Sequence, residues 1–307
     1  MGVERDCLAN TLMSEVVTER AVISDYIELC KPKVVLLMLL CVIVGVCLAS
    51  PSGVPLDVLL FCTVGVGLVA SSAAVINHLA DSHIDAKMAR TQNRPVATGR
   101  VGQREGLIFA AILGVAGMLV LWFLTNPLTA WLNLCSWVGY GLVYTFFLKR
   151  ATSQNIVIGG LFGAAPPLFG WTAVTDSIEP GGLLLVLIIF AWTPPHFWAL
   201  AIDRKEEYAE AGVPMLPVTH GDRFTRLHIL LYTVLLSAIS LMPYLIGMSG
   251  LIYLVGALLL AGGFLYLALA LFFTRKSSLP GLTFRYSIVY LGLLFLFLVL
   301  DHYYTFI

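Results

Sequence analysis

The sequence predicts an all-α, polytopic membrane protein, from its composition, its long apolar runs and the distribution of its charges. Of 307 residues, 59% are hydrophobic and only 12% are charged, and the mean hydropathy is +0.91. Soluble domains average about 25% charged residues, so this composition excludes an ordinary soluble protein. The net charge is zero, and nothing in the sequence indicates nucleic-acid binding.

Nine apolar runs are long enough to cross a bilayer, at about 20 residues for each span. They are 34–50, 56–76, 107–125, 128–147, 156–175, 183–202, 227–248, 250–273 and 284–301. Turn-forming Pro, Gly, Ser and Asn residues mark the tight joints between them. The fifth run carries Pro166 and Pro167, and the sixth carries Pro194 and Pro195. Each pair is expected to kink or break its helix, which membranes tolerate where the freed carbonyls face protein or a cavity.

The positive charges orient the chain. All 18 Lys and Arg residues lie in the N-terminal tail or in the segments that follow the second, fourth, sixth and eighth runs. The positive-inside rule then places these segments and the N-terminus in the cytoplasm, and the C-terminus outside. The first thirty residues lack the features of a signal or transit peptide, so we expect a bacterial inner (plasma) membrane. Residues 1–33 are predicted to be a cytoplasmic tail, and 34–307 an intramembrane domain.

A polar motif directly follows the second run. Asn77, Asp81 and Asp85 recur every four residues, so on a helix each lies about 40° around from the last and the three share one face. Ionisable groups at the edge of a span are functional by default. Carboxylate and amide oxygens suit Mg²⁺, which is usually shared with substrate phosphates, and Arg90 and Arg94 would contact the same phosphates. The pattern indicates a diphosphate site at a membrane surface; solvated helix-end carboxylates and topology-setting arginines are the alternative.

A second acidic pair, Asp203 and Glu207, opens the segment after the sixth run. Its spacing of four and its place after an even-numbered span match the first motif. We therefore expect both carboxylates on one face of a cytoplasmic extension of that helix, as a second set of metal ligands; Glu206 competes for this role, and a solvated helix end is the alternative. Lys149 is interpreted mainly as a snorkelling residue at a helix end, although it shares a face with Tyr144.

These motifs resemble those of the intramembrane UbiA-type prenyltransferases. The first signature is Asn77-x-x-x-Asp81-x-x-x-Asp85 with Arg90-Thr91-x-x-Arg94-Pro95. Further blocks resemble one branch of that family, the protohaem IX farnesyltransferases (haem O synthases): Lys31-Pro32-Lys33-Val34, Thr193-Pro194-Pro195-His196-Phe197-Trp198 and Glu207-Tyr208-x-x-Ala211-Gly212-Val213-Pro214-Met215-Leu216-Pro217. The likeness covers most of the chain beyond its tail. Two positions depart from it, because members of this branch often have Asp in place of Glu207 and Arg in place of Lys33.

The resemblance implies a UbiA-like bundle with an active site on its cytoplasmic face. It implies transfer of a farnesyl group from farnesyl diphosphate to a vinyl group of protohaem IX (haem B), with addition of water, giving haem O. Mg²⁺ would be the cofactor, held by Asn77, Asp81, Asp85, Asp203 and Glu207. The catalytic residues would be Asp81, Asp85, Arg90, Arg94 and Glu207. Other contacts to the bound molecules would come from Asn77, Lys33, Lys87, His196 and Tyr208. The implied partners are the lipid bilayer and a haem A synthase or a terminal oxidase.

Other functions stay open at this point. A related prenyltransferase would act on an aromatic acid or quinone precursor. A secondary transporter also suits proline-broken spans, but it would carry its charges near mid-membrane, whereas these carboxylates cluster at one face. An assembly factor that only binds haem would not require paired acidic motifs. His196 is either a core histidine bonded to a freed carbonyl or a residue that contacts the porphyrin.

Overall fold

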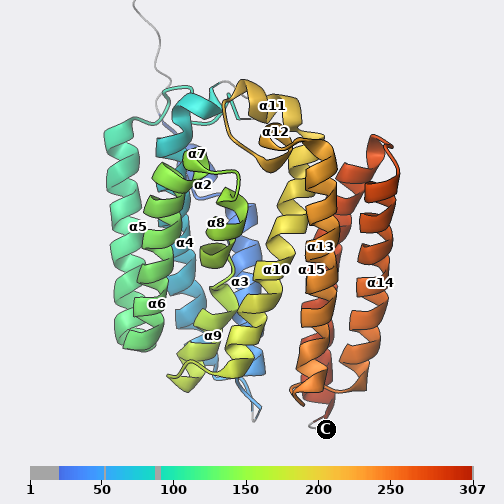
Figure 1. Cartoon of the computed structure of the whole chain (residues 1–307). Helices are drawn as coiled ribbons and strands as arrows, with labels where there is room; N and C mark the ends of the chain where they lie inside the picture. The colour runs from blue at the N-terminus through green and yellow to red at the C-terminus, as the bar shows by residue number, and fades with distance from the viewer. Residues whose placement is uncertain (1–20, 52, 87–90, 306–307) are drawn as a thin grey trace, which may run out of the picture.

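The computed structural model describes residues 21–51, 53–86 and 91–305, which form a bundle of helices running roughly side by side (Figure 1). The long helices are α3 (Pro32–Leu48), α4 (Leu56–Asp85), α5 (Gln103–Leu124), α10 (Pro180–Asp203), α13 (Gly221–Leu245), α14 (Leu251–Phe273) and α15 (Ser278–Thr305). The shorter elements are α2 (Ile23–Leu29), α6 (Pro127–Trp137), the π-helix η1 (Val138–Leu148), α7 (Lys149–Ala151), α8 (Asn155–Gly163), α9 (Pro166–Thr175), α11 (Lys205–Glu210) and α12 (Leu216–Thr219).

The all-α membrane fold is confirmed. Within the described ranges, seven helical segments are long and apolar enough to cross a membrane, with α8 and α9 together (Asn155–Thr175) counted as one of them. The bent pair α2–α3 makes an eighth if it counts as one span. Each of the nine predicted runs coincides with helical chain, and the run 128–147 corresponds to α6 continued by η1. The predicted number of nine is therefore approximate, because it depends on how broken and bent helices are counted.

The segments predicted to be cytoplasmic lie at one end of the bundle. Residues 91–102, in teal, and the yellow helices α11 and α12 cap that end, while the end of α15 lies at the opposite end (Figure 1). Helix α4 packs against α5, α3 packs against α9, and α10 packs against α13 and α15. A Cβ on Gly45 would overlap the carbonyl oxygen of Pro167, and one on Gly170 would overlap that of Val42. Helices α3 and α9 therefore pack backbone against backbone, as small residues allow in membranes.

The two proline pairs affect their helices differently. The fifth run breaks between Gly163 and Pro166, where α8 ends and α9 begins, as predicted. The sixth run stays helical through Pro194 and Pro195 inside α10. These prolines deprive the carbonyls of Phe190 and Ala191 of their helical donors. The buried segment is packed between other helices of the bundle, which maintains the helix despite the missing bonds.

The predicted continuous helix through Asp203 and Glu207 is wrong. Helix α10 ends at Asp203, Arg204 adopts φ −118° and ψ 28°, and α11 begins at Lys205. The break lets the following chain fold back over the end of the bundle, where Val213, Met215 and Leu216 are buried in one apolar cluster with residues of α10. Burial of these side chains outweighs the continuation of a charged helix into water, so the four-residue spacing no longer places the two carboxylates on one face.

Candidate active site

The first acidic motif lies on the last turns of α4. Because this helix continues without a break to Asp85, Asn77, Asp81 and Asp85 share one face, as predicted. They are only 5%, 2% and 4% exposed. Carboxylates at a solvated helix end would be exposed, so their burial excludes that alternative. Buried carboxylates are costly unless they are paired or bind a cation.

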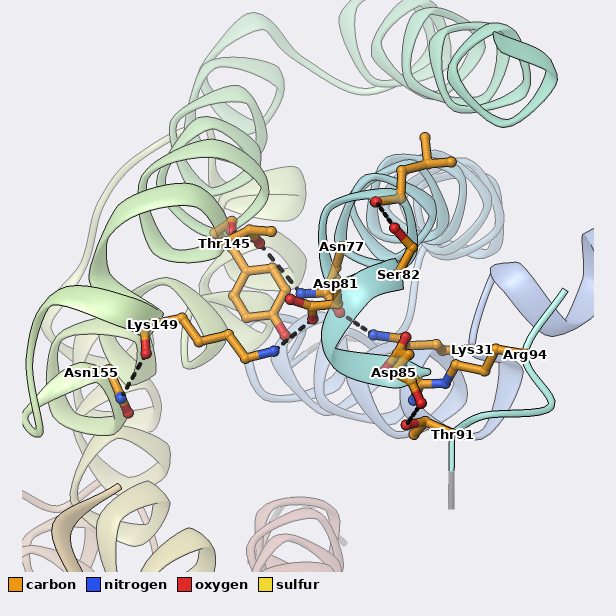
Figure 2. Close-up of polar contacts among 12 residues, drawn as sticks. Lys31, Asn77, Asp81, Ser82, Asp85, Thr91, Arg94, Thr145, Lys149 and Asn155 are labelled. Atoms are coloured by element: carbon orange, nitrogen blue, oxygen red, sulfur yellow. Dashed lines mark hydrogen bonds and ion pairs between the residues drawn. The ribbon is translucent and has the colours of Figure 1, made fainter. Parts of the chain in front are cut away.

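Each polar side chain of the motif meets a cation from a different part of the chain (Figure 2). Lys149 Nζ lies 2.6 Å from Asp81 Oδ2, and Arg94 Nη1 lies 2.7 Å from Asp85 Oδ2. Lys31 Nζ donates a hydrogen bond to Asn77 Oδ1. Two negative charges thus face three positive ones, and the local excess of positive charge favours an anionic ligand.

These residues line a cavity of about 180 Å³. Its polar wall consists of Lys31, Asn77, Asp81, Asp85, Arg94 and Lys149, and its remaining wall of Ile84, Tyr140, Tyr144, Ile156, Phe197, Tyr208, Val213 and Met215. The rings of Tyr140 and Tyr144 stack with centroids 5.2 Å apart. The cavity therefore joins a charged wall to an aromatic and aliphatic one, as an amphiphilic substrate requires.

The donor set fits a divalent cation with oxygen ligands. Asp81 Oδ1 is buried and has no hydrogen-bond partner among the described residues, although buried polar atoms are almost always paired. Hard oxygen ligands of this kind suit Mg²⁺. Within the described ranges no group of three or more His, Cys, Asp or Glu residues is placed to hold a metal. In the part of the chain that the structure describes, the acidic wall of this cavity is formed by Asp81 and Asp85.

Lys31, rather than the predicted Lys33, reaches the cavity. Lys31 is in the left-handed conformation (φ 51°, ψ 58°) at the joint between α2 and α3, which are bent by 52°. Lys33 lies two residues further on and is exposed.

Lys149 also has a different role from the one its sequence predicts. Its side chain does not extend to the surface as a snorkelling residue; it is 16% exposed and paired with Asp81. It follows η1 directly, and Asn155 Nδ2 donates to its carbonyl oxygen. The expected neighbour Tyr144 does line the same cavity, but through the π-helical geometry of η1, since residues five apart in an α-helix point about 140° apart.

The second acidic pair lies outside this cavity wall. Asp203 is exposed. Glu207 Oε1 pairs with Arg204 Nη1 at 3.6 Å, and Glu207 Oε2 is buried without a hydrogen-bond partner among the described residues. The neighbouring Tyr208 does line the cavity. Of the predicted residues of this segment, the structure thus brings only Tyr208 to the first acidic motif. Lys87 and Arg90 lie outside the described residues.

His196 is held between aromatic rings in α10. Its ring stacks on Trp192 and Phe284, with centroids 4.2 and 4.6 Å away. Its Nδ1 lies 2.6 Å from Ser287 Oγ, and that hydroxyl donates to the carbonyl of Phe284. The Nδ1 atom must therefore be the donor, which leaves Nε2 with a lone pair. The hydrogen-bond partner is thus a serine hydroxyl, whereas the sequence suggested a freed carbonyl.

Known proteins are similar to this chain in sequence. Residues 38–300 match the UbiA prenyltransferase family. Proteins named protoheme IX farnesyltransferase are similar throughout: one from Legionella pneumophila (strain Lens) is 61% identical over 91% of this chain and 95% of its own. Another, from Teredinibacter turnerae, is 59% identical over 91% of this chain and 90% of its own.

Solved structures share the fold at lower identity. A structure of digeranylgeranylglyceryl phosphate synthase has a TM-score of 0.78 at 20% identity, over 92% of this chain and 98% of that one. A UbiA homologue from Archaeoglobus fulgidus bound to GPP and Mg²⁺ has a TM-score of 0.63 at 14% identity, over 89% of this chain and 99% of that one.

Proposed function

Because the chain belongs to the UbiA prenyltransferase family, we propose that it transfers a farnesyl group from farnesyl diphosphate to a vinyl group of protohaem IX, giving haem O. The names of relatives at 59% and 61% identity support this substrate pair over a quinone precursor. Membership of a prenyltransferase family disfavours the transporter and the haem-binding assembly factor, for which no structural observation argues.

The bond changes define what the site must do. The C–O bond between the farnesyl carbon and diphosphate breaks, and that carbon bonds to the terminal carbon of the vinyl group. Water then adds as hydroxyl to the other vinyl carbon and releases a proton. The barrier is departure of diphosphate, so stabilisation of the leaving oxygens is the main task of the site.

The residues of the cavity suit this task. Asp81, Asp85 and Asn77 would hold Mg²⁺, which when bound neutralises charge on the leaving oxygens. Lys31, Arg94 and Lys149 converge on the same cavity and would exchange their contacts with the motif for contacts with the diphosphate. The tyrosine and aliphatic wall would hold the first isoprene unit and keep water from the reacting carbon.

One observation carries the proposal: Asp81 Oδ1 is buried and unpaired in a cavity that three cations line. A purely structural ion pair would use both carboxylate oxygens or expose one to water. A carboxylate oxygen left unpaired among cations suits a metal–diphosphate complex.

Roles for the remaining predicted residues belong to the same proposal. Glu207 has a buried, unpaired Oε2, as a ligand for a second Mg²⁺ would. The lone pair on Nε2 of His196 suits contact with the protohaem substrate. Lys87 and Arg90 would contact the diphosphate from the segment that follows α4. Association with haem A synthase or a terminal oxidase stays a prediction.

The location follows from the charge distribution. We infer a bacterial inner membrane, as for an organism like those of the similar proteins. We also infer that the N-terminus and the cavity lie at the cytoplasmic face and the C-terminus outside, because every Lys and Arg follows an even-numbered run or lies in the N-terminal tail. Residues 1–33 would be a cytoplasmic segment that contributes Lys31 to the cavity, and 34–307 the catalytic domain.

The activity is testable in membranes that carry the protein. These are incubated with haem B, farnesyl diphosphate and Mg²⁺, and haem is extracted for mass spectrometry. We expect the mass of haem O, dependent on all three additions and lost in Asp81→Asn. Asp57→Asn is the matched control, since Asp57 is exposed at the opposite end of α4. Prenylation of an aromatic acid in place of haem would refute the proposed acceptor.

A further inference from the structure

The π-helical stretch η1 supplies an unusual contact to the acidic motif. It spans 11 residues, whereas π-helical segments are mostly single turns and are frequent at functional sites. Thr145, which is fully buried, donates a hydrogen bond of 2.9 Å to the carbonyl of Tyr140, five residues earlier. In an α-helix these residues would point about 140° apart. The π geometry instead brings Thr145 above Tyr140, on the side that faces α4.

The neighbours of Asn77 fix the orientation of its amide. Thr145 and Lys31 lie on opposite sides of that amide (Figure 2). The Lys31 ammonium can only donate, so it requires Oδ1. The Thr145 hydroxyl already donates its hydrogen bond to the carbonyl oxygen of Tyr140, so toward Asn77 it can only accept, and Nδ2 of Asn77 lies 3.4 Å from it. Both neighbours therefore demand the same orientation, with Oδ1 on the side of Lys31.

We infer that Thr145 is a positioning residue whose hydroxyl keeps the Asn77 oxygen, and not its NH₂ group, turned toward the cavity. The inference rests on the proposed function, since it matters only if Asn77 Oδ1 is a ligand of the Mg²⁺–diphosphate complex. When Lys31 moves to the diphosphate, Thr145 is the contact that still holds the amide. Without the hydroxyl, the amide rotates freely and presents a positive edge to the cation for part of the time.

The test compares Thr145→Val with Thr145→Ser. Valine keeps the shape and removes the hydroxyl, while serine keeps the hydroxyl. Thr233→Val is the matched control, because Thr233 is also fully buried and donates to a helical carbonyl, Ile229 O at 2.7 Å, but lies in α13. Purified protein in detergent is titrated with Mn²⁺ and inorganic diphosphate, and bound Mn²⁺ is followed by electron paramagnetic resonance.

We expect Thr145→Val to bind Mn²⁺ about 10–100-fold more weakly, the usual effect of losing a group that orients a metal ligand. Thr145→Ser and Thr233→Val should bind like the wild type, and the Mg²⁺ concentration that half-saturates haem O formation should rise only in Thr145→Val. Equal Mn²⁺ affinity in Thr145→Val and the wild type overturns the inference. So does a serine variant as weak as the valine variant, since packing would then explain the loss. If Thr145→Val does not fold, Thr145→Ala replaces it under the same criteria. Wild-type protein that binds no Mn²⁺ overturns the proposed metal site itself.

Discussion

Substitution of Asp81 should affect both catalysis and stability, and the two effects can be measured separately. Its Oδ2 pairs with Lys149 at 2.6 Å, and the two side chains are 3% and 16% exposed. Asp81→Asn leaves the Lys149 ammonium buried beside other cations, and breaking a buried pair in this way costs about 3–5 kcal/mol of stability. It also removes a negative charge from the Mg²⁺ site. We expect haem O formation to fall by about 10³-fold, or about 4 kcal/mol of barrier.

A second substitution distinguishes these two effects. Lys149→Met in the same chain replaces the stranded ammonium by an apolar side chain of similar length. Exchange of a buried ion pair for apolar groups is often neutral, so the double variant should recover most of the lost stability. Its activity should stay at the level of Asp81→Asn, because methionine supplies neither a ligand for Mg²⁺ nor a charge for diphosphate. Stability is measured as the midpoint of thermal unfolding in detergent, and activity as haem O per milligram of folded protein.

Two results would refute this reasoning. If Asp81→Asn keeps more than about a tenth of wild-type turnover at limiting Mg²⁺, the carboxylate does not hold the metal. If the double variant is no more stable than Asp81→Asn, Lys149 and Asp81 are not an energetically coupled pair. Asp57→Asn should change neither quantity.

Three further predictions follow from other parts of the structure. Single cysteines in place of Gly102 and Ile178, in a chain without its native cysteines, should react with an impermeant reagent from opposite sides of the membrane; reaction from one side only would contradict the proposed orientation. Glu207→Gln should be nearly inactive, whereas Glu207→Asp should stay partly active and improve with added Mg²⁺. Asp203→Asn should stay close to wild type, because Asp203 is exposed and outside the cavity wall. Normal turnover of Glu207→Gln at limiting Mg²⁺ would leave Glu207 only as an ion-pair partner of Arg204. Asp301→Asn should lower the free energy of unfolding by about 1–3 kcal/mol and leave the kcat of the folded protein unchanged. The reason is that Asp301 accepts hydrogen bonds from the backbone N–H groups of Gly250 and Tyr253, far from the cavity. A changed kcat with unchanged stability would contradict this.

Apolar runs and helical periodicity were sufficient to predict most of the fold. The runs of about 20 residues located the long helices, and the four-residue spacing of Asn77, Asp81 and Asp85 located one buried polar face. Both features depend on sequence-local geometry, which a single chain displays directly. Arg94 was expected near the motif as a diphosphate contact, and the structure places it beside Asp85, only nine residues away.

The residues that sequence reasoning misplaced depend on backbone geometry that residue types do not reveal. Lys31 reaches the cavity because it adopts the left-handed conformation itself, at the bent joint between α2 and α3. Residue types alone do not reveal that conformation. Lys149 and Thr145 face α4 because η1 is a π-helix, which alters the phase of every residue after it. At Arg204, the burial of distant apolar residues interrupts a helix that local charge spacing suggested.

The length of α4 determines where any reaction takes place. Its 30 residues extend about 45 Å, whereas the hydrocarbon core is about 30 Å thick. Asn77 lies about 32 Å along the axis from Leu56, so the cavity sits at the level of the lipid headgroups. The charged groups and the apolar parts of the proposed substrates meet at that level. These substrates would therefore reach the cavity by lateral diffusion in the bilayer. The governing quantity is then the mole fraction of each substrate in the lipid, and adding inert lipid at constant total substrate slows the enzyme although no buffer concentration has changed.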